Sequence, residues 1–192
     1  MVEYGQYTRR SMNAPLHTPR HLSLPLTADV VRTLRAGDRV ALSGVLYTAR
    51  DAAHKRIVAA LAAGLEPPMD LDGCTLYYTG PTPAPPGHVV GSIGPTTAGR
   101  MDAFTGPLLA HGLRAMIGKG ARGPDVAEAL KRHTAVYFAA VGGAGALLAG
   151  HVRSCAVAAY ADLGAEAVHR LEVDHFPVIV AQDCHGGSVF SR

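Results

Sequence analysis

The chain has 192 residues, of which 48% are hydrophobic and 17% charged, and its formal net charge is +3. A chain of this length and composition can bury a sizeable core, so we expect one compact domain and exclude a wholly disordered protein. The small net charge, the lack of Trp and the absence of long Lys/Arg runs argue against a nucleic-acid partner.

The sequence shows no sign of a membrane or secretory protein. No apolar stretch approaches the roughly 18 residues of a membrane-spanning helix, and the first ten residues are polar. The three cysteines, Cys74, Cys155 and Cys184, are odd in number and far apart, which disfavours a disulfide framework. We therefore expect reduced thiols and a cytoplasmic location.

Strand-like and helix-like segments alternate along most of the chain. Residues 1–20 carry three arginines, two prolines and little periodicity, so we expect an arm that is disordered or contacts a partner. Residues 21–192 are expected to form a single domain. Strands are predicted at 21–26, 39–44, 74–78, 113–117, 135–141, 155–160 and 178–181. Helices are predicted at 28–34 after a Thr27 cap, 52–63, 101–111, 124–133, 143–150 and 164–170. This alternation is typical of an α/β fold with a substantially parallel sheet.

Two turns combine glycine with an arginine. In the first, Arg50 lies where a strand end leads into a helix, and it could hold a carboxylate together with free backbone N–H groups. The second follows a Gly-, Pro- and Thr-rich loop and places Thr96, Thr97 and Arg100 on one bend, offering a guanidinium and a hydroxyl to a bound anion. Both turns also have a structural interpretation, as exposed arginines beside helix caps and a capping threonine.

Two further glycine-rich turns resemble phosphate-binding motifs without matching them. Lys119 stands between two glycines and could reach a ligand, but a P-loop would need glycine at position 113 and Ser or Thr at position 120, where the chain has Leu113 and Gly120. The turn at 142–145 begins like a dinucleotide fingerprint, yet its third glycine would fall at Leu148. Close packing of a helix against a strand is the other interpretation of that turn.

The cysteines and histidines give no clear metal site. Three thiolates could hold an iron–sulfur cluster, but no pair has Cys-x-x-Cys spacing, and Cys74 and Cys155 lie in or beside apolar runs. The ten histidines show no His-x-x-x-His pair, so we expect no metal ligand in this chain. Cys184 and His185 hint at a nucleophile, for which the sequence places no base.

Taken together, these segments resemble the C-terminal domain of class I, iron–sulfur-dependent fumarases and the beta subunit of L(+)-tartrate dehydratase. The resemblance runs from about residue 21 to 190, and residues 1–20 have no match. The matching stretches are 37–38, 43–44, TARDAAHKR at 48–56, YYTGPTP at 77–83, GPTTAGRMD at 94–102, MIGKG at 116–120, AVYF at 135–138, 142–143, 162–167 and 176–178.

This resemblance implies a swivelling, three-layer β/β/α domain and a hydro-lyase that hydrates fumarate to malate or dehydrates tartrate. It also implies a [4Fe–4S] cluster with one open iron, ligated by cysteines of an alpha partner subunit in an αβ or (αβ)2 assembly. By similarity, Arg50, Arg100 and Lys119 would bind the substrate carboxylates, and Thr96 would transfer a proton, with Thr97 also in reach. Two rival hypotheses remain: a stand-alone module that binds small dicarboxylates, and a nucleotide-binding domain built on the turn at Gly143.

Overall fold

The computed structural model describes residues 18–190, and most of the predicted N-terminal arm lies outside this range. Seven strands form one mixed sheet: β1 (Arg20–Ser23), β2 (Arg39–Thr48), β3 (Thr75–Tyr77), β4 (Ala115–Gly118), β5 (Val136–Ala139), β6 (Val152–Ala159) and β7 (Val168–Gln182). The α-helices of these residues are α1 (Ala28–Arg32), α2 (Asp51–Ala62), α3 (Asp102–Ala110), α4 (Pro124–His133) and α5 (Gly145–Ala149). Two 3₁₀ segments, η1 (Ala98–Met101) and η2 (Ala161–Glu166), complete the assignment.

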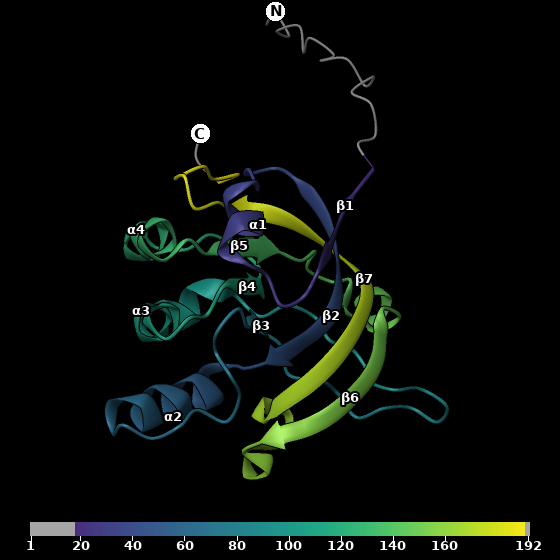
Figure 1. Cartoon of the computed structure of the whole chain (residues 1–192). Helices are drawn as coiled ribbons and strands as arrows, with labels where there is room; N and C mark the ends of the chain where they lie inside the picture. Colours follow the sequence, from purple (N-terminus) through teal and green to yellow (C-terminus); the bar gives the residue numbers. More distant parts are fainter. Residues whose placement is uncertain (1–17, 191–192) are drawn as a thin grey trace, which may run out of the picture.

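The sheet is parallel in one part and antiparallel in the other. Strands β1 to β5 run parallel in chain order, whereas β7 is antiparallel to β2, β5 and β6. Because β7 pairs with both β2 and β5, the pairings β2–β3–β4–β5–β7–β2 form a closed circuit. Figure 1 shows β7 curving between β2 and β6. The predicted α/β class with a substantially parallel sheet is confirmed at this level.

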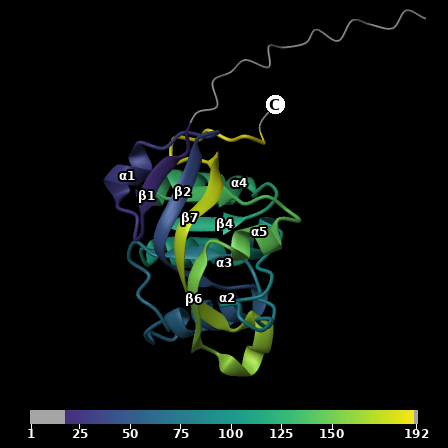
Figure 2. The ribbon, with the colours of Figure 1, turned by 90° about the vertical axis from the view of Figure 1, so that its right-hand side faces the viewer.

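The parallel strands separate two hydrophobic cores because successive side chains of a strand point to opposite faces. On one face Leu76, Met116 and Tyr137 pack with residues of α2, α3 and α4. On the other face Ile117 and Phe138 pack with residues of β1, β2 and β7. Figures 1 and 2 show the three helices on one side of β3–β5 and the long strands on the other.

Most predicted elements are present, but the C-terminal part differs from the prediction. The helix predicted at 164–170 is wrong, since η2 ends at Glu166 and β7 already begins at Val168. The final strand is also far longer than predicted. It pairs with β2 along one edge and with β6 and then β5 along the other. Its buried residues accordingly do not alternate regularly with exposed ones.

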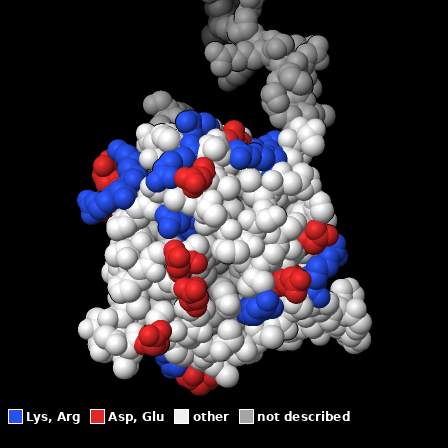
Figure 3. Space-filling view, in the orientation of Figure 1, with Lys and Arg blue, Asp and Glu red and all other residues white. Residues whose placement is uncertain are grey.

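The helices and one face of the surface (Figure 3) bear on the expectations for membrane and polyanion binding. None of the helices within residues 18–190 combines the length and apolar character needed to cross a bilayer. On the face drawn in Figure 3, small groups of basic side chains alternate with acidic ones, and uncharged atoms separate them.

A buried arginine ties α3 to α4. The Arg122 side chain is fully buried; its Nε donates to Asp102 Oδ1 at 2.6 Å and its Nη2 to Thr105 Oγ1 at 2.6 Å. The second Asp102 oxygen accepts the Gly123 N–H at 2.7 Å, just before α4 begins. The guanidinium also lies 5.4 Å from the centre of the Tyr78 ring. Arg122 is therefore a structural cation that no ligand reaches.

Helix α2 buries a neutral histidine against the parallel sheet. His54 is fully buried, its ring lies edge-on to Tyr78, and its Nδ1 is 2.9 Å from the Arg50 carbonyl oxygen. Since a carbonyl can only accept, Nδ1 carries the proton. Burial lowers the pKa of His54 from 6.5 to about 4, so the ring is uncharged at neutral pH.

Removing one partner of the buried ion pair should destabilise the fold strongly. We expect Asp102→Ala to lower the free energy of unfolding by about 3–5 kcal/mol, because the Arg122 charge stays buried and unpaired. Asp162→Ala, which breaks the solvent-exposed pair with Arg56, is the matched control and should cost much less. Urea unfolding of both variants measures this, and equal losses would contradict the structural role of Arg122.

His54 should make the fold sensitive to acid. The folded-state pKa lies below the unfolded value of 6.5, so the unfolded chain binds a proton that the folded chain refuses as the pH falls. The stability is complete above pH 6.5 and should decline by roughly 3 kcal/mol down to about pH 4. In His54→Phe this part of the decline should disappear, while exposed His88→Gln keeps it. Urea unfolding midpoints of the wild type and both variants at pH 7.5 and 4.5 give the comparison. The same drop in midpoint in all three proteins would refute the role of His54.

Candidate functional site

The predicted site residues follow the carboxyl ends of neighbouring parallel strands. Arg50 comes two residues after β2, and Lys119 directly follows β4. Residues 78–97 leave β3 and return to the same edge, and the glycines at 142–143 follow β5. In α/β proteins, ligands commonly bind at the carboxyl ends of the parallel strands, because the loops that leave these strands converge there. The topology therefore brings together segments that are far apart in the sequence.

Backbone pairing fixes Thr96 beside Lys119. The Thr96 N–H donates to the Tyr78 carbonyl at 2.6 Å, and the Thr96 carbonyl accepts the Lys119 N–H at 3.1 Å. Ala98 N–H then donates to the Lys119 carbonyl at 2.8 Å, so this turn runs parallel to the end of β4. A side chain at Gly118 would lie 2.9 Å from the Tyr78 ring, which explains why the approach needs a glycine.

Side chains at the end of β3 hold the turn that precedes Thr96. The Tyr77 hydroxyl donates to the Ile93 carbonyl, and the Thr79 hydroxyl donates to the Gly94 carbonyl at 2.8 Å. Thr96 is half-buried and Thr97 is exposed. Thr97 precedes η1 without making a side-chain cap, so its interpretation as a capping threonine is wrong. Within residues 18–190 the Thr96 hydroxyl has no hydrogen-bond partner either, which leaves it open to a ligand.

The two predicted arginines meet through the first turn of α2. Arg50 precedes α2, and its Nη2 lies 3.3 Å from Glu166 Oε1. Arg100, on η1, directs its Nε to Asp51 Oδ1 at 2.9 Å and its Nη2 toward Oδ2 at 2.8 Å. Arg50 is 26% exposed and ion-paired, so its interpretation as an exposed arginine beside a cap is wrong.

The net positive charge in this region is lower than the three predicted cations alone would give. Three cations were expected, but Asp51 and Glu166 add two carboxylates that sequence reasoning missed. Arg50 and Arg100 are both ion-paired, whereas the exposed Lys119 has no ion-pair partner among residues 18–190. Asp51 adjoins Arg50 in the sequence, which is a weak signal, whereas Glu166 gave none because β6 separates it from the other site residues.

Unpartnered buried polar atoms gather in the same turn. Across residues 18–190, six buried side-chain N and O atoms lack a hydrogen bond, and three of them are Arg50 Nε, Asp51 Oδ2 and His54 Nε2. Asp51 Oδ2 is close to Arg100 Nη2 but is not aligned for a hydrogen bond, so the contact is a charge contact. Native proteins rarely leave such atoms without a hydrogen bond, so the first turn of α2 is unusual in holding three of them.

The glycine-rich turn at 142–145 packs against the segment that precedes Thr96. A side chain at Gly145, the first residue of α5, would lie 2.2 Å from Ser92 Oγ and 2.8 Å from the Gly94 nitrogen. The Ile93 N–H also donates to the Gly145 carbonyl at 3.2 Å. These contacts support close packing as the reason for glycine there. Helix α5 has only five residues and offers no long dipole to a nucleotide phosphate.

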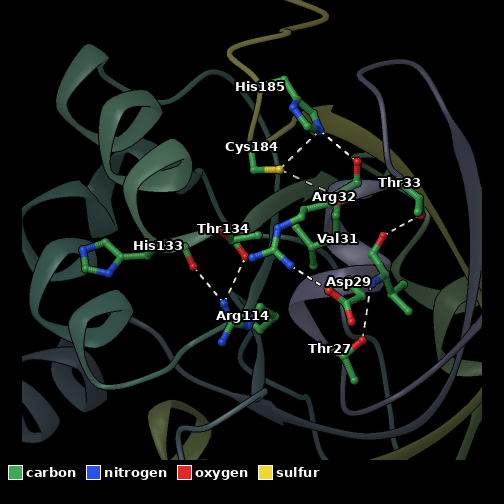
Figure 4. Close-up of polar contacts among 11 residues, drawn as sticks. Thr27, Asp29, Val31, Arg32, Thr33, Arg114, His133, Thr134, Cys184 and His185 are labelled. Carbon is green, nitrogen blue, oxygen red and sulfur yellow. Dashed lines mark hydrogen bonds and ion pairs between the residues drawn. The ribbon is translucent and has the colours of Figure 1, made fainter.

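Cys184 and His185 lie away from this edge, beside α1. Figure 4 shows them with the polar contacts of α1, where Cys184 Sγ is 3.5 Å from His185 Nε2. The same Nε2 is 2.9 Å from the Arg32 carbonyl oxygen, so it carries the proton and cannot take one from the thiol. Burial raises the pKa of the Cys184 thiol. The hint of a nucleophile is therefore not supported.

The residues that the structure describes do not assemble a metal centre of their own. Between residues 18 and 190 no three His, Cys, Asp or Glu side chains converge to hold an ion. The cysteines lie before β3, within β6 and after β7, and burial raises the pKa of Cys74 to about 12. A cluster bound by three thiolates therefore does not fit these residues.

Comparison with known proteins finds a matching family model and several relatives. A family model described as "Fumarase C-terminus" matches residues 6–192. The chain is 34% identical over 190 residues to the aerobic class I fumarate hydratase of Escherichia coli (strain K12), covering 98% of this chain and 33% of that protein. It is 37% identical over 158 residues to fumarate hydratase 2 of Leishmania major, covering 81% and 28%.

A smaller relative is covered almost completely. The putative L(+)-tartrate dehydratase subunit beta of Methanocaldococcus jannaschii is 39% identical over 173 residues, which make up 87% of this chain and 89% of that protein. The chain thus spans about a third of the fumarate hydratases that it matches, but most of this separate subunit. Because the family model matches nearly the whole chain, the protein belongs to the fumarase C-terminus family.

Proposed function

We propose that this chain is the beta subunit of a two-subunit, [4Fe–4S]-dependent hydro-lyase that interconverts fumarate and malate or dehydrates L-tartrate. The gathering of Arg50, Arg100, Lys119 and the free Thr96 hydroxyl at one edge of the sheet carries this proposal. The match to 89% of a putative L(+)-tartrate dehydratase subunit beta supports the two-subunit form. An αβ or (αβ)2 assembly in the cytoplasm is part of the same proposal.

The fold and the missing cluster ligands are consistent with this division of labour. Helices on one face of β3–β5 and long strands on the other support a swivelling, three-layer β/β/α domain, which we propose for residues 21–192. We propose that the alpha subunit holds the cluster, since the described cysteines of this chain do not converge. The predicted arm at residues 1–20 stays a prediction.

In the proposed reaction the residues of this chain bind the substrate and move a proton. When bound, the cluster would supply a Lewis acid for the substrate hydroxyl. Arg50 and Arg100 would bind carboxylate oxygens, and Lys119 would neutralise further charge at the opposite side of the turn. The Thr96 hydroxyl would exchange a proton with the substrate carbon. Threonine is a weak base at its ordinary pKa, so a group from the partner must assist it.

A stand-alone dicarboxylate-binding module is the rival function. It would use the same cations, but it would have no need of a partner. The match to a relative named as a subunit beta favours a site that another subunit completes. A nucleotide-binding domain has less support, because the turn at Gly143 leads into a short helix and its glycine at 145 is explained by packing.

The isolated chain should fold, stay colourless and lack hydratase activity. Anaerobic incubation with iron and sulfide should produce no stoichiometric cluster absorbance, because its cysteines do not converge. Adding the alpha subunit should produce both colour and malate or tartrate dehydration. A cluster bound to this chain alone, or activity without the partner, would contradict the proposal.

Substitutions at Arg100 and Thr96 should separate binding from proton transfer. Arg100→Lys keeps the charge but loses the planar fork, so we expect KM to rise about tenfold to a hundredfold with little change in kcat. Thr96→Ala removes a group that acts in the transition state and should lower kcat by roughly 10²–10⁴ with KM nearly unchanged.

The neighbouring Thr97→Ala is the matched control for Thr96, and the cluster content of each reconstituted complex must be equal. Normal kcat in Thr96→Ala together with loss in Thr97→Ala would move the proton-transfer role by one residue. Normal kcat in both variants would leave this turn with substrate binding alone.

A further inference from the structure

Each predicted substrate-binding arginine is held by a carboxylate of this chain. Asp51 contacts the Nε and Nη2 side of Arg100, and Glu166 contacts Nη2 of Arg50. Both arginines are long, flexible side chains that would otherwise lose considerable rotamer entropy when they bind a ligand. A carboxylate that already fixes the guanidinium removes part of that cost before the substrate arrives.

The contact with Asp51 also decides which edge of Arg100 remains free. A guanidinium has five N–H donors arranged around one plane. Asp51 occupies the side formed by Nε and one hydrogen of Nη2. The edge formed by Nη1 and the other hydrogen of Nη2 therefore stays open, and it can still bind a carboxylate through two parallel hydrogen bonds. The Arg100 side chain is 51% exposed, so a ligand can approach it from solvent.

Glu166 holds Arg50 from the segment that joins β6 to β7. Its Oε1 is 3.3 Å from Arg50 Nη2, and its Oε2 accepts the Ala52 N–H at 3.2 Å. The same segment is anchored farther along α2, where Asp162 accepts from Arg56 at 2.8 Å. Gly80 lies beneath it, because a side chain there would be 2.8 Å from the Ala165 carbonyl oxygen. Glu166 is thus held by two contacts of its own side chain, on a segment that packs closely against the loop after β3.

We infer that Asp51 and Glu166 are positioning residues, which orient Arg100 and Arg50 so that their remaining donors face the carboxylates of a dicarboxylate substrate. They do not touch the substrate themselves. The inference rests on the proposed function and extends it, since it assigns to two acidic residues the geometry of a site that binds anions. A carboxylate that merely competed with the substrate would have the opposite effect on affinity.

The test uses the reconstituted complex of this chain with the alpha subunit, prepared anaerobically with equal cluster content in each variant. In Asp51→Asn, KM for malate or tartrate should rise about five- to thirtyfold, with kcat within about twofold, because one charge-assisted contact is lost. Glu166→Gln should behave in the same way. Asp29→Asn, which removes the exposed partner of Arg32 on α1, is the matched control and should leave KM unchanged.

A double variant separates positioning from a general loss of structure. In the Arg100→Lys background, Asp51→Asn should raise KM less than twofold further, because the group that Asp51 orients is already absent. Asp51→Glu, which keeps the charge and moves it by one methylene, should show an intermediate KM even if the asparagine variant folds poorly. The melting temperature of each variant of this chain is measured separately and shows whether the variant is folded.

The outcomes distinguish this inference from the proposed function. If the wild-type complex is active and Arg100→Lys raises KM, but Asp51→Asn and Asp51→Glu do not, the positioning role is wrong and the function stands. A lower KM in Asp51→Asn would show competition with the substrate and would also overturn it, as would full multiplication of the two effects in the double variant. An inactive wild-type complex refutes the proposed function, and this inference with it.

Discussion

The pairing of β7 along both of its edges is the constraint on which the rest of the molecule depends. One edge follows β2 from Arg170 to Ile179, and the other is shared by β6 and then β5. A strand bonded on both sides fixes how far apart β2 and β5 can lie, and so closes the circuit through β3 and β4. Because β1 to β5 are parallel, their carboxyl ends lie on one side of this sheet. The loops that follow these strands therefore start next to one another.

Close backbone approach turns that shared edge into a site. Gly118 lets the turn at 96–98 lie against Tyr78, and Gly145 lets the preceding turn lie against α5. Side chains would collide at both positions, so small residues here serve packing rather than flexibility. Beneath this layer, buried Arg122 joins the starts of α3 and α4 through Asp102. Because Asp102 directly follows η1, these contacts also anchor the end of the segment that carries Arg100.

In the candidate site, carboxylates offset most of the positive charge. Arg50 and Arg100 are each matched by a carboxylate, while Lys119 stands without an ion-pair partner among residues 18–190. A site of this kind remains attractive to an anion, but the net attraction is about that of one cation. Under the proposed function, these residues supply the part of the binding site that this chain contributes.

The sequence by itself determined the local elements and the residue types of the site. The Thr27 cap, the Pro124 helix start and the apolar strands were predictable because short-range hydrogen bonds and periodicity decide them. The GPTTAGR and GKG turns were identifiable because glycine beside a cation or hydroxyl is a local pattern.

Only the tertiary structure decided how these pieces meet. The absence of a helix at 164–170 reflects the pairing of β7 with β6, and the length of β7 also depends on β2, more than a hundred residues away, so no local pattern contains it. The same holds for Glu166, which reaches Arg50 across 116 positions of sequence, and for the side-on contact of Asp51 with Arg100. Charge pairing is a property of distances in space, so the composition of the site could be read from the chain while its net charge could not.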